Sequence, residues 1–200
     1  ILDYGDLSVV SFHATKVFNT FEGGAIISQH GAAKQSIDRL TNYGIVDENT
    51  IATVGLNAKM SEIHAAMGIA QLPYVDAAIV ARRKVDERYR ELLDGLPGIE
   101  PVKWPNGQNR NYYAFPILVG EEFGCTRDEL HQQMKLAGIN ARRYFYPLIS
   151  DLATYRDHAA RGNDPLDVAK RIGRSVLCLP MYPDLSDADL QRVAQVIRHC

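Results

Sequence analysis

Lys16 is the residue of this chain that is best placed to act as a carbonyl-condensing amine. It follows Ser11 by five positions, at the end of the apolar run Leu7–Phe12, and the pair Gly23–Gly24 comes soon after it. Burial of such a strand end disfavours the ammonium form and favours the free, nucleophilic amine. The pattern is compatible with a Schiff-base lysine, although the spacing alone favours the alternative, a solvated lysine on a strand-to-loop turn.

A second group of polar residues has the composition of a binding site for an anionic ligand. The short stretch Arg142–Leu148 joins two arginines to the phenols of Tyr144 and Tyr146. Guanidinium groups bind phosphate oxygens, and aromatic rings cover a base or a sugar, so the mixture suits a nucleoside diphosphate. We therefore predict substrate-binding roles for Arg142, Arg143, Tyr144 and Tyr146. The alternative is an edge strand with exposed arginines and buried aromatic side chains.

Four segments of the chain together resemble one protein family. They are Gly5–Lys16 with its continuation to Ala25, Gly55–Glu62, Arg142–Leu148 and Leu179–Pro183. They resemble the DegT/DnrJ/EryC1/StrS family of pyridoxal-phosphate-dependent sugar-nucleotide aminotransferases, over nearly the whole chain. The resemblance implies that pyridoxal 5'-phosphate is the cofactor and that Lys16 is both its Schiff-base partner and the general base that moves the proton.

The same resemblance assigns further cofactor contacts. It implies that the hydroxyl of Ser11 binds the cofactor phosphate and that Asn57 reaches the phosphate of the partner subunit's cofactor. His13 lies between Ser11 and Lys16 and is predicted to line the cofactor pocket or to assist proton transfer. From the residues alone, Ser11 could instead bond a backbone carbonyl, Asn57 could cap the next helix, and His13 could be structural.

The chain departs from the family pattern beside two of these positions. Leu56 and Ala58 replace aromatic residues around Asn57, and Lys59 replaces an arginine. A stacking role beside Asn57 and a bidentate role for Lys59 are therefore not carried over. Ile149 stands where the family typically has histidine after the proline-leucine pair, so no role of that histidine is transferred.

The expected fold is α/β, of the aspartate-aminotransferase-like fold type I. Residues 1–75 are expected to be the end of the large cofactor-binding domain, and residues 76–200 the small C-terminal α/β domain. In the family the lysine lies near the middle of a longer chain, so this chain is expected to be the C-terminal half. A helix from Met60, interrupted at Pro73 and resumed to Leu93, is predicted to join the two domains, with the boundary between Pro73 and Ile79.

The periodicity predicts the remaining elements as follows. The first domain has strands at 7–12 and 25–28, a helix at 32–43 ended by Gly44, and a loop at 44–56. The second has strands at 112–119 and 140–145, a helix from the capping box Thr126–Glu129 to Gly138, a helix from Asp164–Pro165 to Arg174, an apolar run at 176–179 and a last helix capped by Ser186.

Composition limits the class of protein. The net charge of -2 with scattered lysines and arginines argues against a nucleic-acid-binding surface. Three cysteines, Cys125, Cys178 and Cys200, are odd in number and lack metal-ligand spacing, so we expect neither a disulfide framework nor a metal site. The sequence also shows no signal peptide or apolar membrane-spanning run. These features favour a cytoplasmic protein with no membrane partner.

The leading functional hypothesis is an enzyme. It transfers an amino group, from glutamate by family expectation, to a nucleotide-linked keto-6-deoxyhexose for deoxyaminosugar and O-antigen polysaccharide biosynthesis, as a homodimer. The residues of Arg142–Leu148 are most similar to enzymes that aminate C4 of dTDP-4-keto-6-deoxyglucose. One alternative is a truncated, non-catalytic dimerisation or binding module. Another is a sugar-nucleotide dehydratase of the same family, in which histidine replaces the lysine, and Lys16 argues against it.

Overall fold

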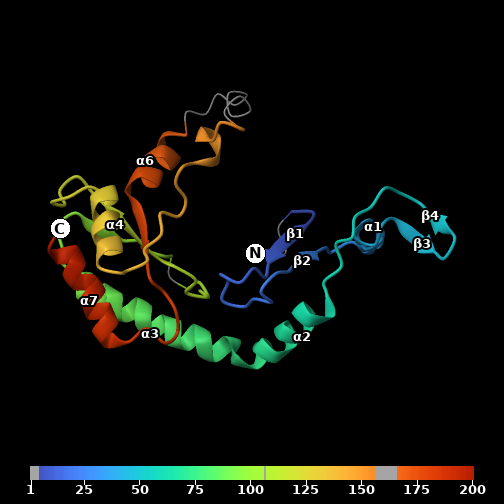
Figure 1. The fold of residues 1–200 in the computed structure, drawn as a ribbon, viewed down its shortest axis with the longest axis horizontal. Helices are drawn as coiled ribbons and strands as arrows, with labels where there is room; N and C mark the ends of the chain where they lie inside the picture. The colour runs from blue at the N-terminus through green and yellow to red at the C-terminus, as the bar shows by residue number, and fades with distance from the viewer. Residues whose placement is uncertain (1–4, 106, 156–165) are drawn as a thin grey trace. The chain divides into compact units, whose positions relative to one another are not determined.

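The computed structural model describes residues 5–105, 107–155 and 166–200. The contacts divide the chain into two compact units, Ile1–Asp76 and Ala77–Cys200 (Figure 1). The division lies at a helical joint: α2 (Glu62–Gln71) is followed by the 3-10 turn η1 (Leu72–Tyr74) and by α3 (Val75–Leu93). This confirms the predicted helix with an interruption at Pro73.

The first unit begins with a two-stranded antiparallel hairpin. Strand β1 (Ser8–Ser11) pairs with β2 (Gly24–Ile27), with Ser8 opposite Ile27 and Ser11 opposite Gly24. Both strands were predicted. The expectation of a buried strand is wrong for this chain, because side chains alternate between the two faces and Val9 on one of them is 78% exposed.

A helix and a second hairpin complete the first unit before α2. Helix α1 (Gly31–Thr41) ends where Tyr43 and Gly44 adopt positive φ angles of 59° and 77°. The predicted loop at 44–56 instead contains the paired strands β3 (Ile45–Asp47) and β4 (Thr50–Ile51). The side chain of Asp47 accepts the backbone N–H of Asn49 at 3.0 Å, which closes the turn and lowers the pKa of this carboxyl.

The second unit is a three-stranded antiparallel sheet covered by helices. The sheet order is β5 (Ile99–Pro101), β6 (Phe115–Val119), β7 (Val176–Leu179), and α4 (Arg127–Leu136) packs on β7 and on α7 (Asp187–Arg198). The unit also contains η2 (Ile149–Asp151) and α6 (Asp167–Ser175). The largest fully buried side chains all belong to this unit: Tyr89, Leu93, Phe115, Ile117, Leu130, Met134, Leu177 and Ile197.

Local capping signals were predicted correctly in this unit. The Thr126 side chain accepts the backbone N–H of Glu129, and the Glu129 carboxylate accepts the backbone N–H of Thr126 at 2.8 Å. Ser186 caps α7 in the same way, by accepting the backbone N–H of Asp189 at 3.1 Å. The predicted helix start at Asp164–Pro165 lies outside the described residues.

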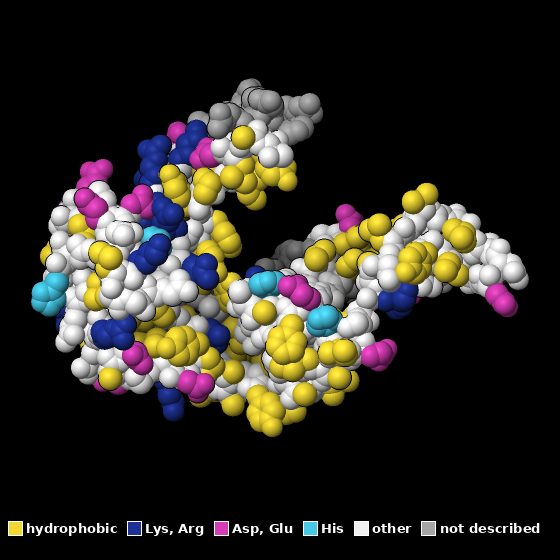
Figure 2. Space-filling model, viewed as in Figure 1, with side chains coloured by type: hydrophobic (Ala, Val, Ile, Leu, Met, Phe, Trp, Pro, Cys, Tyr) yellow, Lys and Arg dark blue, Asp and Glu magenta, His cyan; other side chains and the backbone are white. Residues whose placement is uncertain are grey.

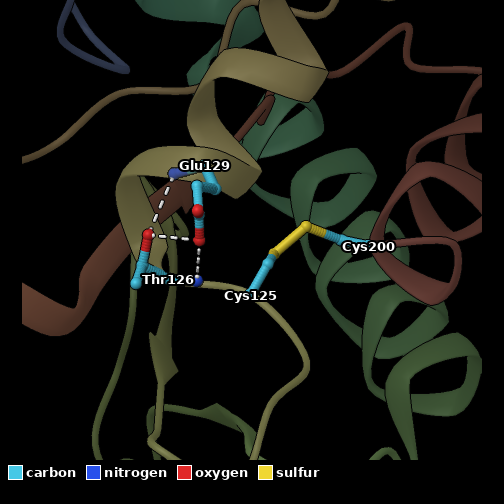
Figure 3. The surroundings of a disulfide bond; sticks show 4 residues. All are labelled: Cys125, Thr126, Glu129 and Cys200. Carbon is cyan, nitrogen blue, oxygen red and sulfur yellow. Dashed lines mark hydrogen bonds between the residues drawn. A yellow bond between two sulfur atoms is a disulfide. The ribbon is translucent and has the colours of Figure 1, made fainter.

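Two expectations for the second unit are wrong. Residues 140–145 form no strand: only Arg142 pairs with Cys178, and the chain then turns, with the N–H of Tyr146 donating to the carbonyl of Arg143 at 2.8 Å. Cys125 and Cys200 form a disulfide, with their Cα atoms 5.8 Å apart (Figure 3). They are 75 positions apart in sequence, and the packing of α4 on α7 brings them together.

The helical segment Glu62–Leu93 also differs from the expectation of no membrane-spanning run. By length and composition alone it could cross a membrane, with a mean hydropathy of 1.3 in a window of which 6% is buried within the chain. This is weak evidence for a membrane span. An apolar, uncovered helix face is equally what a subunit interface presents before the partner binds.

Candidate active site

Lys16 lies on a turn that backbone hydrogen bonds close at its base. The N–H of Phe12 donates to the carbonyl of Gly23 at 2.8 Å, and the N–H of Thr20 donates to the carbonyl of Phe12 at 2.9 Å. Inside this loop, the N–H of Lys16 donates to the carbonyl of His13 at 2.9 Å, and the Lys16 side chain is half-buried. The hairpin between β1 and β2 therefore presents the amine from a loop with a fixed base.

Helix α2 supports this turn from behind. Thr20 is 2% exposed, and its hydroxyl donates to the carbonyl of Glu22 at 2.8 Å. Gly68 of α2 lets Thr20 pack closely against the helix, because a Cβ at position 68 would lie 2.8 Å from Cγ2 of Thr20. The rings of Phe12 and Phe18 meet edge to face at 5.0 Å. Sequence reasoning missed Thr20 and Gly68, and a glycine inside a helical pattern was the available signal.

Ser11 and His13 lie on the same turn as Lys16. The hydroxyl of Ser11 accepts the backbone N–H of His13 at 3.3 Å, which leaves the hydroxyl hydrogen for another acceptor. The Nδ1 atom of His13 accepts the backbone N–H of Thr15 at 3.2 Å, so the ring proton of neutral His13 belongs on Nε2, which lies 3.7 Å from Oε1 of Glu22. The structure thus groups three of the predicted cofactor residues, and their roles stay predictions.

Asn57 lies on a different segment of the first unit and is exposed. Its alternative interpretation as a helix cap is wrong, because Ser61 caps α2 by accepting the backbone N–H of His64. The side chain of Asn57 instead accepts from the ammonium of Lys59 at 3.4 Å. An exposed amide held by a neighbour suits a contact with a group outside this chain.

The four predicted substrate residues line one cavity in the second unit. Its volume is about 640 Å³, and its walls include Arg142, Arg143, Tyr144 and Tyr146. His131 and Lys135 of α4 line the same cavity, and sequence reasoning missed them. Their spacing of four places both on one helix face, which was the only signal for them. Figure 2 shows Lys and Arg side chains gathered beside α4, with a histidine among them.

A buried arginine and a carboxylate arrange the wall of this cavity. Arg127 is buried and donates to the carbonyls of Gly173 and Val176, and its guanidinium lies 4.8 Å from the ring centre of Tyr146. The guanidinium of Arg143 lies 5.4 Å from the same ring. Tyr146 is therefore in cation–π contact with two guanidinium groups.

Asp128 pairs with both of these arginines. Its Oδ1 accepts from Nη1 of Arg143 at 3.0 Å and from Nε of Arg127 at 2.8 Å. Partial burial on its own would raise the pKa of Asp128, but the bonds from Arg143 and Arg127 bring that pKa below its usual value. One Nη of Arg143 is thus engaged with Asp128, and its remaining N–H groups are those that could bind phosphate.

The described residues offer no ligand set for a metal ion. Residues 5–105, 107–155 and 166–200 hold no group of three or more His, Cys, Asp or Glu side chains that could bind a metal ion.

The free cysteine Cys178 is not a reactive nucleophile. It is buried in β7, and burial raises the pKa of its thiol, so the reactive thiolate form is disfavoured.

The comparison with known proteins identifies the class. The chain matches the DegT/DnrJ/EryC1/StrS aminotransferase family over residues 1–198, and it belongs to that family. The predicted fold class, α/β of fold type I, is confirmed by the fold that it shares with solved sugar aminotransferases. DesI, solved in the presence of its TDP-sugar product, has a TM-score of 0.89 and 34% identity and matches 98% of this chain and 50% of its own.

The chain is also similar to a named sugar transaminase and to a second solved aminotransferase. The dTDP-4-amino-4,6-dideoxy-D-glucose transaminase of Shigella dysenteriae is 46% identical over 201 residues, which are 99% of this chain and 53% of that protein. DesV of S. venezuelae, solved with a ketimine intermediate, has a TM-score of 0.85 and 26% identity over 98% of this chain and 52% of its own. The chain thus spans about half the length of the relatives it matches.

The family's cofactor is pyridoxal phosphate, and the residues of the first unit fit it. An aldehyde needs a primary amine, which Lys16 supplies from the loop. A phosphate needs donors, and the hydroxyl of Ser11 retains a hydrogen to give. The amide of Asn57 is exposed and can donate as well.

Proposed function

We propose that the protein containing this chain is a pyridoxal-phosphate-dependent transaminase that aminates C4 of dTDP-4-keto-6-deoxyglucose. The observation that carries the proposal is the loop after β1, which holds Lys16 and the hydroxyl of Ser11 on one turn closed by backbone hydrogen bonds. The match at 46% identity to a transaminase named for a 4-amino sugar supports the position of amination.

Four residues of the first unit have a task in this proposal. Lys16 would hold the cofactor and, as a free amine, would take the proton from the reacting carbon of the amino donor and deliver a proton to C4 of the keto sugar. Ser11 and Asn57 donate to the phosphate, and His13 lines the pocket with its Nε2–H toward Glu22. When bound, pyridoxal phosphate supplies the electron sink for the reaction.

The cavity in the second unit is the proposed substrate side. Arg142 and Arg143 bind the diphosphate of the sugar nucleotide, and Tyr144 and Tyr146 cover the sugar or the base. Glutamate is the proposed amino donor. The product is a 4-amino-4,6-dideoxy sugar nucleotide, the kind of building block used for O-antigen polysaccharides.

A homodimer is the proposed assembly. The described part of the first unit exposes many large apolar side chains, which a folded protein covers in its working state. Among them are Val54, Leu56, Ile63, Ile69 and Tyr74. A second copy covering them would bring Asn57 to the neighbouring cofactor, as the family pattern implies. It would also account for the apolar helix without a membrane.

The proposed compartment is the cytoplasm, and the disulfide bears on it. Structural disulfides are rare in reducing compartments. This part of the proposal is tested by alkylating the protein at cell lysis and counting the thiols that were reduced in the cell. Three reactive thiols after denaturation support the cytoplasm, whereas one thiol contradicts it.

The central test is labelling of Lys16. Pyridoxal phosphate is added to the protein containing this chain, the visible Schiff-base absorbance is recorded, and borohydride followed by peptide mapping identifies the modified lysine. We expect label on Lys16, and a Lys16→Ala variant that folds normally without absorbance or turnover. Lys34→Ala, which removes a surface lysine paired with Asp38, is the matched control and should behave as wild type. A Lys16→Ala protein that still transaminates would refute the assignment.

The reaction itself is tested with dTDP-4-keto-6-deoxyglucose and glutamate. We expect formation of 2-oxoglutarate and a 4-amino sugar nucleotide, identified by mass and by NMR of the C4 proton. Amination at C3 would replace the proposed position, and no amination of any nucleotide-linked keto sugar would overturn the activity.

A further inference from the structure

The ammonium group of Lys59 lies between two asparagine side chains. Its Nζ atom is 2.7 Å from Oδ1 of Asn42, 3.4 Å from Oδ1 of Asn57 and 4.7 Å from the ring centre of Tyr43. An ammonium group only donates hydrogen bonds, so each amide must face it with its oxygen. The NH₂ group of Asn57 is thereby directed away from Lys59.

The backbone around Asn57 is already fixed by the end of α1. Asn42 and Asn57 form an antiparallel bridge, the N–H of Tyr43 donates to the carbonyl of Leu56 at 3.0 Å, and the N–H of Ala58 donates to the carbonyl of Thr41 at 3.0 Å. The only large freedom left to Asn57 is rotation of its exposed side chain. The hydrogen bond from Lys59 restricts that rotation.

We propose that Lys59 is a positioning residue for cofactor binding: it holds the amide of Asn57 with the NH₂ group outward, ready to donate to the cofactor phosphate. This inference rests on the proposed function. A phosphate accepts hydrogen bonds and repels a carbonyl oxygen, so only one of the two amide orientations is productive. Without Lys59, both orientations and other rotamers are populated, and binding must select the productive one.

A set of variants separates this role from a direct contact of Lys59 with the phosphate. Pyridoxal phosphate is titrated into the wild type, Lys59→Met, Lys59→Arg, Asn57→Ala and the double variant, and the Kd is read from cofactor absorbance. We expect Lys59→Met to raise Kd roughly fivefold and Asn57→Ala more than about tenfold. Lys59→Arg keeps the charge and the donors, and should stay within about twofold of wild type.

The double variant decides the mechanism. If Lys59 acts through Asn57, then Lys59→Met has no further effect in the Asn57→Ala background, and the two effects do not add. If the effects add, Lys59 acts on the phosphate by itself, and the inference is overturned. It is also overturned if Lys59→Met binds as wild type does.

Two controls keep the outcomes distinct. Lys34→Met removes one positive charge from the same unit and should leave Kd unchanged, so an equal loss there would show a plain charge effect and contradict the inference. Failure of the proposed function appears differently, as a wild-type protein that binds no pyridoxal phosphate. Far-UV circular dichroism of Lys59→Met should match wild type, because Lys59 is exposed.

Discussion

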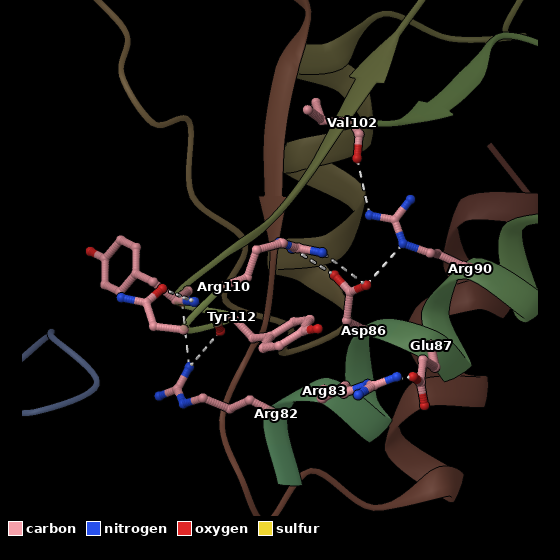
Figure 4. A network of polar contacts seen from close by, with 10 residues as sticks. Arg82, Arg83, Asp86, Glu87, Arg90, Val102, Arg110 and Tyr112 are labelled. Carbon is pink, nitrogen blue, oxygen red and sulfur yellow. Dashed lines mark hydrogen bonds and ion pairs between the residues drawn. The ribbon is translucent and has the colours of Figure 1, made fainter. Parts of the chain in front are cut away.

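Replacement of Asp86 by asparagine should destabilise the second unit strongly, because Asp86 is a buried charge with two arginine partners. It lies on α3, is 3% exposed, and accepts from Nε of Arg90 at 2.9 Å and from Nη2 of Arg110 at 3.0 Å (Figure 4). Asparagine keeps the shape of the side chain but removes the negative charge. Both guanidinium groups then lose their counterion.

The magnitude follows from the burial of the partners. Breaking a fully buried ion pair by removing one partner costs about 3–5 kcal/mol. Here the side chains of Arg90 and Arg110 are 34% and 17% exposed, and Arg90 also donates to the carbonyl of Val102 at 3.0 Å. Solvent and this second bond offset part of the loss. We therefore expect Asp86→Asn to lower the free energy of unfolding by about 2–3 kcal/mol.

Urea unfolding measures this loss with two signals. Far-UV circular dichroism follows the helices, and fluorescence follows Trp104, the one tryptophan in the chain. The guanidinium of Arg110 lies 4.7 Å from the ring centre of Trp104 and 4.5 Å from that of Tyr112. Loss of the Asp86 contact should therefore shift the tryptophan emission of the folded protein as well as the midpoint.

Glu87→Gln is the matched control on the neighbouring residue. Glu87 pairs with Arg83 at 2.8 Å, but their side chains are 54% and 63% exposed, so the change should leave the urea midpoint close to that of the wild type. If Asp86→Asn unfolds at the same urea concentration as Glu87→Gln, the reasoning from burial is refuted.

Three other perturbations have defined outcomes. Thr126→Ala removes the cap of α4 and should lower the free energy of unfolding by about 1 kcal/mol in the same urea assay, and no change would contradict the capping box. Asp128→Asn should cost up to about 1 kcal/mol near neutral pH. Because the folded pKa of Asp128 is lowered, that stability is present above its unfolded pKa and disappears as pH falls through the folded pKa, so a pH-independent difference would contradict the ion pairs. Cys125→Ser should lower the free energy of unfolding by about 4 kcal/mol relative to the oxidised wild type, because the disulfide closes a loop with a sequence separation of 75. The variant should be as stable as the reduced wild type. A variant as stable as the oxidised protein would show that the disulfide contributes nothing.

The parts of the fold that could be predicted from the sequence depend on residues that lie close together in the chain. The proline in the long helix and the threonine–glutamate pair that caps α4 act within one helical turn. The hairpin at 45–51 was missed because its strands are three and two residues long, too short to show alternation. The disulfide was missed because its two cysteines meet only after α4 and α7 pack.

In the candidate site, too, residues close together in sequence could be predicted and residues joined by tertiary contacts could not. Lys16, Ser11 and His13 fall within six consecutive positions, so a local motif identifies them together. Arg127 and its neighbour Asp128 carry no such motif. Their part in the cavity depends on the start of α4 approaching the loop at 142–146, a tertiary contact across 15 positions that helical periodicity does not encode.

In both units, a neighbouring residue orients a predicted site residue through a hydrogen bond or an ion pair. Lys59 fixes the amide of Asn57, Thr15 fixes the tautomer of His13, and Asp128 holds one arm of Arg143. Each contact uses one hydrogen-bonding position of the site residue and directs the remaining donors away from it. A ligand that meets these donors does not need to order them, so less of the binding free energy is spent on conformational entropy. Replacing an orienting residue should therefore weaken binding while the chemistry that follows it stays intact.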